Sequence, residues 1–577
     1  MRGCALVAAA CVSALVAAQT VPPEAASGWT AKRAVTSRSF MVAVANPLAA
    51  EAGYRILQQG GTAVDATIAV QLVLGLTEPQ SSGLGGGAFL LAHDARTRRL
   101  IAYDGRETAP AAAMPTRFVG PDGTAVDFHA ASLGGMAVGV PGVVRLLEIV
   151  HRRHGRLPWA ALFAPAIALA DNGFAISPRL HRLVAGERDF SPAARAYFLE
   201  ADGSPRAAGT ILRNPAYAAT LRRIAREGAA AFYTGPVAQD IVDTVRADPV
   251  RPGDLSLADL AAYRVKVREA VCDTYRAWRV CGMPLPSSGG ITVLQILKLL
   301  EPYPIADMGP ASFWSTHFLS EAGRLAFADR SVYEADPDFY TPPAGLLDSG
   351  YLRQRAGLIT TRGSLGRASP GTLPLRPSSV RAVAWGADAA ADLPSTSHVA
   401  IVDRQGNAVS MTTTIERAFG SRLMTQSGFL LNNEMTDFSF VPVENGKPVA
   451  NRIEPGKRPR SAMSPTIVYD RAGRVYALAG ASGGPPIINY VAKTLLGILD
   501  WELDPQAAID LPNVGSQNGP TELEAGTPAA ALAPKLAALG HQVVVIPHTS
   551  GLQAIVRTRT GWIGGADPRR EGIVLGD

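Results

Sequence analysis

The sequence predicts a mixed α/β protein (α+β) whose sheets are built from hairpin-connected strands and covered by helices. Residues 46–79 hold two successive helical segments, and the second is apolar on nearly every side, so we expect it to be buried. Residues 142–262 follow a mostly helical hydrophobic period. After residue 395 the chain changes to short strands joined by tight turns, with two helical segments among them. This order favours antiparallel sheets with flanking helices over a parallel βαβ series.

The N-terminus has the composition of a secretory signal peptide. Arg2 supplies a positive charge, an apolar stretch follows, and Val16 and Ala18 fit a cleavage site after Ala18. Cys11 loosely suggests a lipoprotein signal, but the branched residue expected three positions earlier is missing. No apolar run of membrane-spanning length follows the signal. We therefore expect a mature protein without a membrane span, located in the periplasm or secreted.

Charge and ligand spacing argue against several functional classes. The chain carries 55 basic and 49 acidic residues, which gives a formal net charge of +6. Most of the basic residues are Arg, and no stretch combines them with aromatic residues as a nucleic-acid-binding face would. The nine His show no HExxH and no Cys/His ligand spacing. The sequence predicts no nucleic-acid partner, no metal site and no cofactor.

Cys272 and Cys281 are the two cysteines outside the signal segment. They flank DTYRAWRV, a plausible hairpin that would bring them opposite one another. In an exported protein this arrangement favours a disulfide over two buried thiols. Such a bond would brace the hairpin and would have no catalytic role.

Residues 83–106 combine a glycine cluster with a charged residue at a strand end. The glycines of SSGLGGG lead directly into the strand AFLLAH, without the pattern or the following helix of a phosphate-binding loop. We interpret them as a site of close backbone packing or a turn that faces substrate. Arg106 follows the next strand, where it is either solvated or able to bind a carboxylate with both nitrogens.

The chain changes character at Thr396. Residues 361–395 are rich in Pro, Gly and Ser and are expected to form a flexible linker, and VAIVD, a turn and AVSMTTT then predict a β-hairpin. If the chain were cut between Ser395 and Thr396, Thr396 would carry a nucleophilic hydroxyl and a free α-amine. That amine has a reference pKa of about 7.7–8.0 and can accept a proton near neutral pH. By itself, a Thr at a strand start is more often an ordinary edge residue.

A competing pattern lies at residues 480–484, which read G-x-S-x-G between a strand and a helix, as in a nucleophile elbow around Ser482. The required Ser, Asp, His order is completed by Asp500, Asp504, Asp510, His541 and His548. The elbow would come late in the chain, and two prolines occupy the start of the helix. The Gly483-Gly484 pair could instead donate N–H groups to the oxyanion formed by another nucleophile.

Several ordered blocks resemble the γ-glutamyltranspeptidase (glutathione hydrolase) family of N-terminal-nucleophile hydrolases. The most specific are AVDATIAVQLVLGLTEPQSSGLGGGAF, YDGRETAP, MPLPSSGGI, STSHVAIVDRQGNAVSMTTTI, GFLLNNEMTDFS, GKRPRSAMSPTI, GASGG and GADPRREG. The resemblance covers nearly all of the mature chain. It implies a four-layer αββα sandwich formed jointly by two chains that are cut from one precursor. These are residues 19–395 and 396–577, with 1–18 removed as the signal peptide.

The resemblance also implies roles for individual residues. Thr396 is the expected nucleophile, its own amine the base, Thr414 its hydrogen-bond partner, and Gly483 and Gly484 the oxyanion hole. The substrate head group is expected to meet Arg106 with its α-carboxylate, with further contacts from Glu434, Asp437 and Ser461. Two positions depart from the family pattern: Ala462 replaces a serine, and Glu416 replaces an Asn found in many members. We expect these departures to weaken binding of the substrate carboxylate, because Ala462 removes a hydrogen-bonding hydroxyl. Glu416 would also bring a second negative charge, unless it turns away, is protonated or pairs with a cation such as Arg106.

The resemblance implies a γ-glutamyl hydrolase/transferase that cleaves glutathione and related compounds through an ester on Thr396. The acyl group then passes to water or to an amino acid or peptide amine. The alternatives are a β-lactam (cephalosporin-type) or other amide acylase on the same scaffold, a Ser482 hydrolase, and a binding protein on a degenerate scaffold. The intact set of Thr396, Thr414 and the glycine pair argues against the binding protein.

Overall fold

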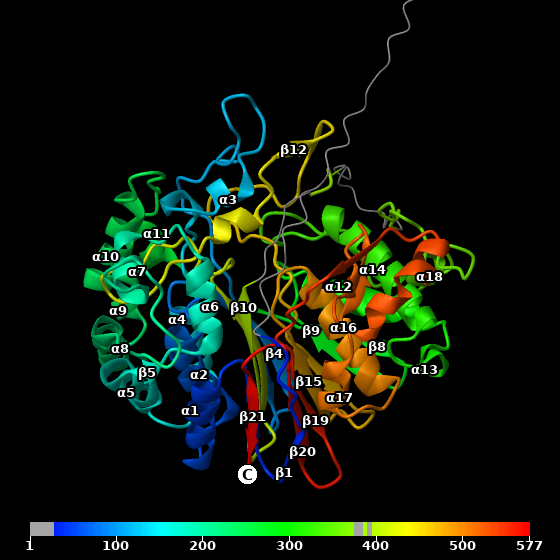
Figure 1. Cartoon of the computed structure of the whole chain (residues 1–577), viewed down its shortest axis with the longest axis horizontal. Helices are drawn as coiled ribbons and strands as arrows, with labels where there is room; N and C mark the ends of the chain where they lie inside the picture. The colour runs from blue at the N-terminus through cyan, green and yellow to red at the C-terminus, as the bar shows by residue number, and fades with distance from the viewer. Residues whose placement is uncertain (1–27, 374–384, 389–394) are drawn as a thin grey trace, which may run out of the picture.

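The computed structural model describes residues 28–373, 385–388 and 395–577. The expected signal peptide and much of the second half of the expected linker lie outside these residues. Two seven-stranded antiparallel sheets form the centre of the molecule, with helices on both outer sides (Figure 1). This arrangement confirms the αββα sandwich that the resemblance implied.

One sheet contains the strand that begins at Thr396. Its seven strands, in spatial order, are β21 (Ile573–Gly576), β2 (Met41–Val44), β10 (Thr396–Val402), β11 (Ala408–Thr414), β3 (Gly87–Asp94), β4 (Arg99–Gly105) and β7 (Lys266–Arg268). The predicted hairpin is formed by β10 and β11, which lie in the middle of this sheet.

The other sheet packs against the first. Its strands, in spatial order, are β1 (Val35–Ser37), β20 (Trp562–Ala566), β19 (Gln553–Arg557), β15 (Val475–Gly480), β14 (Thr466–Tyr469), β9 (Trp278–Gly282) and β8 (Val271–Tyr275). Three smaller sheets pair β5 (Phe174–Ala175) with β6 (Ile211–Leu212), β12 (Val443–Glu444) with β13 (Lys447–Pro448), and β16 (Val514–Ser516) with β17 (Thr521–Glu524) and β18 (Val543–Ile546).

All seven residues of β10 are buried. Because side chains alternate along a strand, they point in turn toward the two faces of the sheet. Val399 and Ile401 point into the core shared with the first helical layer, whereas Ala400 and Val402 point into the core shared with the second sheet and its helices. Both faces of the strand are therefore apolar, as expected for a strand at the centre of a sandwich.

The first helical layer covers the sheet of β10, on the left of Figure 1. Its helix α2 is buried along almost its whole length, as predicted, and begins with a capping box between Thr62 and Asp65. The helices of this half are α1 (Pro47–Gln58), α2 (Ala63–Thr77), α3 (Phe128–Ala131), α4 (Val143–His154), α5 (Ala164–Asn172), α6 (Pro178–Gly186), α7 (Pro192–Phe198), α8 (Pro215–Glu227), α9 (Ala230–Tyr233), α10 (Gly235–Arg246) and α11 (Leu257–Ala262), with the short 3-10 turns η1 (Gly135–Ala137) and η2 (Trp159–Phe163).

The second helical layer, on the right of Figure 1, covers the other sheet. It is formed by α12 (Gly289–Leu300), α13 (Ile305–Met308), α14 (Phe313–Tyr333), α15 (Ser349–Ala356), α16 (Pro486–Leu499), α17 (Pro505–Asp510) and α18 (Ala533–Ala538), with the 3-10 turn η4 (Pro528–Leu532). Helices from both sides of residue 395 share this layer, and strands from both sides share each of the two large sheets, so the two expected chains pack closely together.

Two local expectations differ from the structure. Pro485 and Pro486 do not disturb the helix after Ser482: α16 begins at Pro486, because the first turn of a helix tolerates proline. The segment around Glu434 was expected to belong to the β-rich part, yet Glu434–Asp437 forms the 3-10 turn η3. Hydrogen bonds from the side chains of Asn432 and Asn433 hold this segment in an irregular course.

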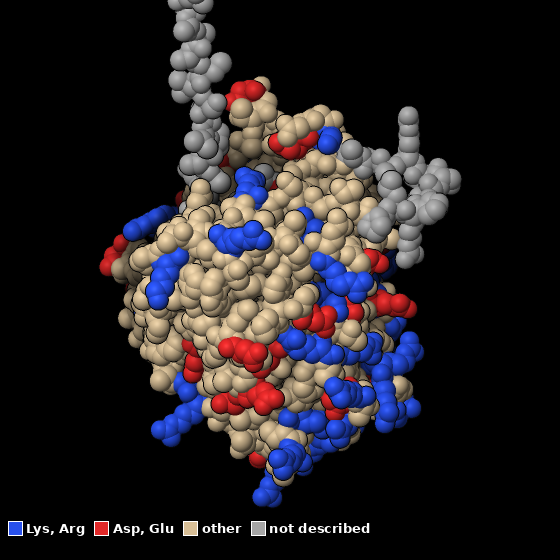
Figure 2. Space-filling model, turned by 90° about the vertical axis from the view of Figure 1, so that its right-hand side faces the viewer, with Lys and Arg blue, Asp and Glu red and all other residues tan. Residues whose placement is uncertain are grey.

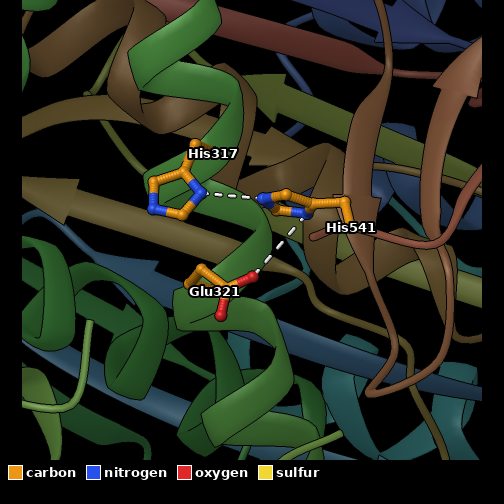
Figure 3. Close-up of side chains that lie close together, drawn as sticks. All are labelled: His317, Glu321 and His541. Carbon is orange, nitrogen blue, oxygen red and sulfur yellow. Dashed lines mark hydrogen bonds and ion pairs between the residues drawn. The ribbon is translucent and has the colours of Figure 1, made fainter. Parts of the chain in front are cut away.

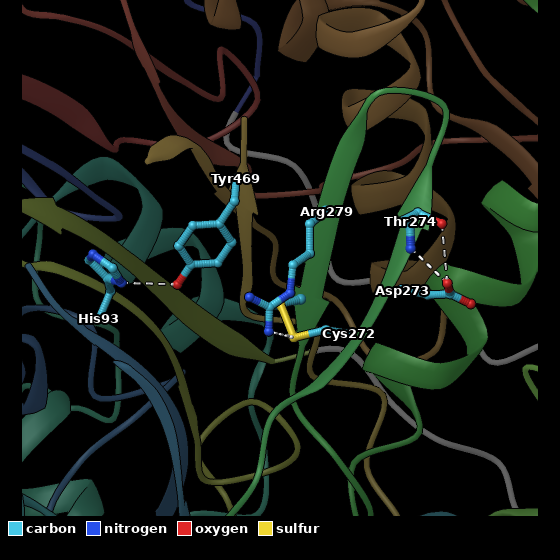
Figure 4. Close-up of a disulfide and its surroundings, with 7 residues drawn as sticks. His93, Cys272, Asp273, Thr274, Arg279 and Tyr469 are labelled. Carbon is cyan, nitrogen blue, oxygen red and sulfur yellow. Dashed lines mark hydrogen bonds between the residues drawn. A yellow bond between two sulfur atoms is a disulfide. The ribbon is translucent and has the colours of Figure 1, made fainter. Parts of the chain in front are cut away.

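The hairpin of β8 and β9 carries the expected cysteine pair. Cys272 and Cys281 are directly opposite in the strand register and are joined by a disulfide with an S–S distance of 2.07 Å (Figure 4). Arg279 lies beside Cys272, with its Nη2 3.4 Å from the sulfur. The hairpin lies at the edge of its sheet, where β8 is the outermost strand, so the disulfide braces this edge.

Among the helices that the structure describes, none is long and apolar enough to cross a membrane.

Candidate active site

Thr396 is the first residue of β10 and lies directly opposite Thr414, the last residue of β11. Only 4% of Thr396 is exposed. The residue therefore lies at the end of two central strands, where the regular sheet gives way to loops. The sequence prediction of a hydroxyl residue at the mouth of this hairpin matches this geometry.

The carbonyl group before Thr396 is held by a short chain of hydrogen bonds. The chain is continuous between Ser395 and Thr396, and the Thr414 hydroxyl donates to the carbonyl oxygen of Ser395 over 2.7 Å. The backbone N–H of Glu416 donates to the Thr414 hydroxyl oxygen over 2.8 Å. Because the hydroxyl accepts this second bond, its single proton is directed at the Ser395 carbonyl. A donor in this position can stabilise negative charge that develops on that oxygen.

Contacts from distant segments fix both sides of the same peptide bond. The Ser395 hydroxyl donates to the carbonyl oxygen of Gln80 over 2.6 Å. Arg570 donates from Nη1 to the Thr396 carbonyl oxygen over 3.1 Å and from Nε to the Thr549 hydroxyl over 3.0 Å. Sequence reasoning assigned no role to Gln80 or Arg570, although both lie in blocks that carry the family resemblance.

Gly483 and Gly484 form a turn after β15 and have φ angles of 118° and 65°. These left-handed conformations are strained for residues with a side chain, so the turn requires glycine. The turn lies between the strand end and α16, as expected for residues that present backbone N–H groups.

Ser482 is fully buried, and its hydroxyl has no hydrogen-bond partner among the described residues. The histidines proposed for a serine triad are engaged elsewhere: His548 is bonded by the Tyr490 hydroxyl at 2.7 Å, and His541 is bonded to His317 at 2.7 Å. Within the described part of the chain, Ser482 therefore has no general base, and the geometry does not favour the serine hydrolase.

Arg106 lies just past β4 and is almost completely buried. It forms ion pairs with Glu434 and Asp437, and its Nη1 lies 3.9 Å from a carboxylate oxygen of Glu107. Its guanidinium also donates to the carbonyl oxygens of Pro459, at 3.3 Å, and Arg460, at 3.1 Å. The structure thus brings together three of the residues that were predicted to bind the substrate head group.

Arg106 is surrounded by more acidic groups than one guanidinium can neutralise. Burial raises the pKa of Glu107 to about 7, against the opposing effect of Arg106. Burial also raises the pKa of Glu434 well above its ordinary value. Ionising every carboxyl group here would place several like charges in a site without water to screen them. Part of the cluster therefore holds protons at neutral pH.

Glu416 extends this acidic cluster toward Thr414. The Asn433 amide donates to one of its carboxylate oxygens, and Asn433 also accepts a bond from the Arg417 N–H at 3.0 Å. Glu416 has a φ of 74°, which is unusual for a residue other than Gly or Asn. Burial first, and then the charge of Asp437, raise the pKa of Glu416 well above its ordinary value.

Ser461 and Ala462 lie beside the second sheet. The Ser461 carbonyl oxygen accepts bonds from the backbone N–H of Ser288 at 2.8 Å and from its hydroxyl at 2.6 Å. The Ser461 hydroxyl oxygen accepts a bond from the N–H of Met463 at 3.1 Å. Ala462 packs into the apolar core and offers no hydroxyl. These bonds fix the backbone of residues 461–463. Because Ala462 has no hydroxyl, the segment has one hydrogen-bonding side chain fewer than the family pattern implies.

The structure also assembles a group of possible metal ligands that the sequence pattern did not indicate. His317 and Glu321 from α14 lie next to His541, and all three side chains are buried (Figure 3). Their polar atoms are already engaged: Glu321 accepts from Arg324 at 2.9 Å and from Ser364 at 2.7 Å. The cation of Arg324 lies 3.5 Å from His541 and would repel a metal ion. The cluster acts as a polar contact between segments on either side of residue 395.

Comparison with known proteins agrees with this site. The family described as Gamma-glutamyltranspeptidase matches residues 49–576. The "Glutathione hydrolase proenzyme" of Bacillus subtilis (strain 168) is 34% identical over 556 residues, covering 94% of this chain and 92% of that protein. The "Acylase ACY 1 proenzyme" of Pseudomonas sp. (strain SE83) is 33% identical over 557 residues and covers 94% of both chains.

A solved structure supports the same conclusion. The cephalosporin acylase from Bacillus halodurans superposes with a TM-score of 0.82 at 26% identity, covering 97% of this chain and 98% of that one. Relatives named as glutathione hydrolases and as acylases therefore share nearly the full length of the chain. From the family match and the extent of these similarities, we conclude that this chain belongs to the gamma-glutamyltranspeptidase family.

Proposed function

We propose that this chain is a self-processing γ-glutamyl hydrolase/transferase with Thr396 as its nucleophile. The observation that carries this proposal is the hydrogen bond from Thr414 to the carbonyl oxygen of Ser395, directly before Thr396. Membership of the family and the similarity to glutathione hydrolase proenzymes support the same activity. Glutathione and other γ-glutamyl compounds are the proposed donors, and water or an amino acid or peptide amine is the proposed acceptor.

Maturation is proposed to begin with attack of the Thr396 hydroxyl on the carbonyl carbon of Ser395. Thr414 donates to the carbonyl oxygen as it becomes negative. The C–N bond between Ser395 and Thr396 then breaks, the nitrogen takes up a proton, and Ser395 is left as an ester on Thr396. Water hydrolyses the ester and releases Thr396 with a free amine and a free hydroxyl. The products are residues 19–395 and 396–577, which stay together because their strands share both sheets and their helices share the second helical layer.

Catalysis by the mature enzyme is proposed to repeat this chemistry on a substrate amide. The Thr396 amine, with a reference pKa of about 7.7–8.0, accepts the hydroxyl proton as the oxygen attacks the γ-carbonyl carbon. The N–H groups of Gly483 and Gly484 are proposed to bind the oxyanion. The amine returns the proton to the leaving nitrogen, and an ester forms on Thr396. Attack by water or an amine then releases the acyl group.

The head group of a γ-glutamyl donor is proposed to enter the ion pairs around Arg106. Its carboxylate would replace a protein carboxylate on Arg106, and its ammonium group would pair with the released Glu434 or Asp437. This exchange keeps the buried charge balanced, which limits the desolvation cost. An acyl group without these charges would leave the ion pairs intact.

A second candidate is an acylase that acts on a β-lactam side chain or another amide. Two features favour it: Ala462 provides no hydroxyl for a substrate carboxylate, and Arg106 already has two carboxylate partners. The similarity to an acylase proenzyme and to a cephalosporin acylase also supports it. The γ-glutamyl activity remains our first proposal because Arg106, Glu434 and Asp437 are all present in one cluster.

We propose a periplasmic or secreted location. The signal-like N-terminus and the disulfide between Cys272 and Cys281 support export to an oxidising compartment.

The test is to express the full chain and to analyse it on a denaturing gel and with a γ-glutamyl anilide. We expect two fragments, whose junction by N-terminal sequencing is Thr396, and turnover of the anilide. Thr396→Ala should remain a single inactive chain. Ser482→Ala is the matched control and should be cut and active, because its hydroxyl has no assigned role. A processed, active Thr396→Ala protein would refute the nucleophile assignment.

A further inference from the structure

The end of the sandwich opposite Thr396 is built from hairpin tips that carry arginines. β10 starts at Thr396 and ends at Val402, about 20 Å away at the usual rise per residue. The β10–β11 tip contains Arg404, the β3–β4 tip Arg98, and the β19–β20 tip Arg559. The tips of both sheets therefore meet at this end, and arginine is their shared feature.

These tips enclose a cleft of about 530 Å³. Its cationic wall is formed by Arg38, Arg98, Arg404, Arg474, Arg557 and Arg559. Figure 2 shows Lys and Arg side chains gathered at the lower end of the molecule, where Figure 1 places β1, β20 and the C-terminus. A concave surface on which one sign of charge predominates concentrates counter-ions of the opposite sign.

One carboxylate, that of Asp403, also lines the cleft, and it is occupied by its own loop. One of its oxygens accepts from the N–H groups of Gln405 and Asn407, both at 2.9 Å. The other accepts from the N–H of Ala63 at 3.0 Å and from the Asn407 amide at 2.8 Å. These bonds hold Asp403 in place as a turn-forming residue, so it does not neutralise the arginines by direct pairing. Arg474 is the exception among the wall arginines, because it forms an ion pair with Asp470 at 2.8 Å.

Several of the guanidinium groups are held in place by contacts within the protein. Arg557 lies 4.2 Å above the ring of Trp562 and donates to the Val475 carbonyl over 2.7 Å. Arg404 lies 4.8 Å above the ring of Phe40. Guanidinium groups that are already ordered lose less conformational entropy when an anion binds. By contrast, the side chains of Arg98 and Arg559 have no ion-pair or hydrogen-bond partner within the described residues.

We propose that this cleft is a binding site for a group carrying two or more adjacent phosphates. Arginine matches phosphate oxygens with two parallel N–H donors, and guanidinium groups from both sheets surround one concavity. A single phosphate would contact a minority of them, whereas linked phosphates reach across the cleft. The ligand is either soluble or the head group of a lipid. In both cases binding leaves the Thr396 end of the molecule free.

The test uses the full, processed protein and inorganic triphosphate, diphosphate and monophosphate, titrated by calorimetry at constant ionic strength. We expect saturable binding of one triphosphate per heterodimer, at least tenfold tighter than monophosphate. Arg98→Gln/Arg559→Gln should weaken triphosphate binding at least tenfold without affecting the fold, because neither side chain has a structural contact. The control Arg353→Gln/Arg362→Gln removes the same charge from exposed positions outside the cleft and should change binding less than twofold.

The γ-glutamyl anilide assay provides a separate readout, and both double variants should keep wild-type turnover. Flotation with phosphatidylcholine vesicles, with and without a diphosphorylated lipid, identifies the source of the phosphates. Vesicle binding that triphosphate displaces assigns the site to a lipid head group, and triphosphate binding without vesicle binding assigns it to a soluble ligand. Absence of saturable binding to either, or equal losses in the cleft and control variants, would overturn the proposal. A failure of the γ-glutamyl assay alone would not overturn the phosphate-binding proposal, because the cleft does not depend on the catalytic assignment.

Discussion

The side-chain amide of Asn433 donates a hydrogen bond to one carboxylate oxygen of Glu416, and the other oxygen has no partner within the described chain. Burial and the nearby charge of Asp437 raise the Glu416 pKa well above its ordinary value. A carboxyl group that holds its proton carries one O–H donor. In its protonated form Glu416 can donate to a substrate oxygen much as an asparagine amide would, and in its ionised form it repels a substrate carboxylate. The expected repulsion therefore stays a prediction that depends on pH.

The first prediction concerns the pH dependence of donor binding. As pH rises through the raised pKa of Glu416, the group loses its proton, adds a negative charge and loses its donor. We expect kcat/KM for a γ-glutamyl anilide to fall on this alkaline side, and Glu416→Gln to remove that fall. The Thr396 amine titrates in both the unchanged protein and Glu416→Gln, so it does not account for a difference between their pH profiles. The other charged groups that face Glu416 are Asp437, Glu434, Arg417 and Arg422. Identical pH profiles would show that Glu416 does not titrate in the donor site.

The second prediction concerns specificity at the same site. Glu416→Asn/Ala462→Ser restores the family residues, and the new serine hydroxyl can donate to the substrate carboxylate. One such bond is worth on the order of 1.5–3 kcal/mol, or about tenfold or more. We expect the ratio of kcat/KM for γ-glutamyl anilide over glutaryl anilide to rise by this factor. Ala462→Ser alone should supply most of the gain at a pH below the Glu416 pKa, where the protonated group does not repel the carboxylate. An unchanged ratio would remove both positions from the specificity site.

The third prediction concerns maturation. Thr414→Ala removes the hydroxyl that donates to the Ser395 carbonyl, and we expect cleavage to slow by about 10²–10³-fold, as for loss of one oxyanion donor. Thr414→Ser keeps the donor and should mature at close to the wild-type rate. The measurement is a time course of precursor and fragments on denaturing gels after pulse labelling. Wild-type kinetics in Thr414→Ala would exclude this hydrogen bond from the cleavage step.

The fourth prediction concerns acid stability. Burial lowers the His541 pKa to about 4, against the opposing charge of Glu321 and with smaller contributions from His317 and Arg324, whereas an unfolded histidine titrates near its ordinary value of 6.5. Between these values the unfolded chain binds more protons than the folded one, so the free energy of unfolding falls as pH falls. We expect His541→Gln to give a shallower dependence of Tm on pH between 6.5 and 4. His129→Gln, which removes an exposed histidine, should leave the slope unchanged. Equal slopes in all three proteins would show that His541 does not contribute.

Much of the fold could be predicted from local sequence patterns, because these patterns agree with the tertiary structure. Apolar residues on nearly every side of residues 63–76 predicted a buried helix, and α2 is buried along that segment. The turn at residues 405–407 predicted the hairpin of β10 and β11. The course of residues 429–438 was less predictable, since side-chain bonds from Asn432 and Asn433, rather than a backbone ladder, determine it.

By itself, the sequence determined the mixed α/β fold, the hairpin that starts at Thr396 and the residue types needed for acyl transfer, because alternation and turn chemistry are local properties. Only the tertiary structure decided which of these residues meet. It placed Thr414 on the Ser395 carbonyl, paired Arg106 with Glu434 and Asp437, and left Ser482 without a base among the described residues. It also raised the pKa of Glu416, because a pKa depends on burial and on neighbouring charges that come from distant parts of the chain.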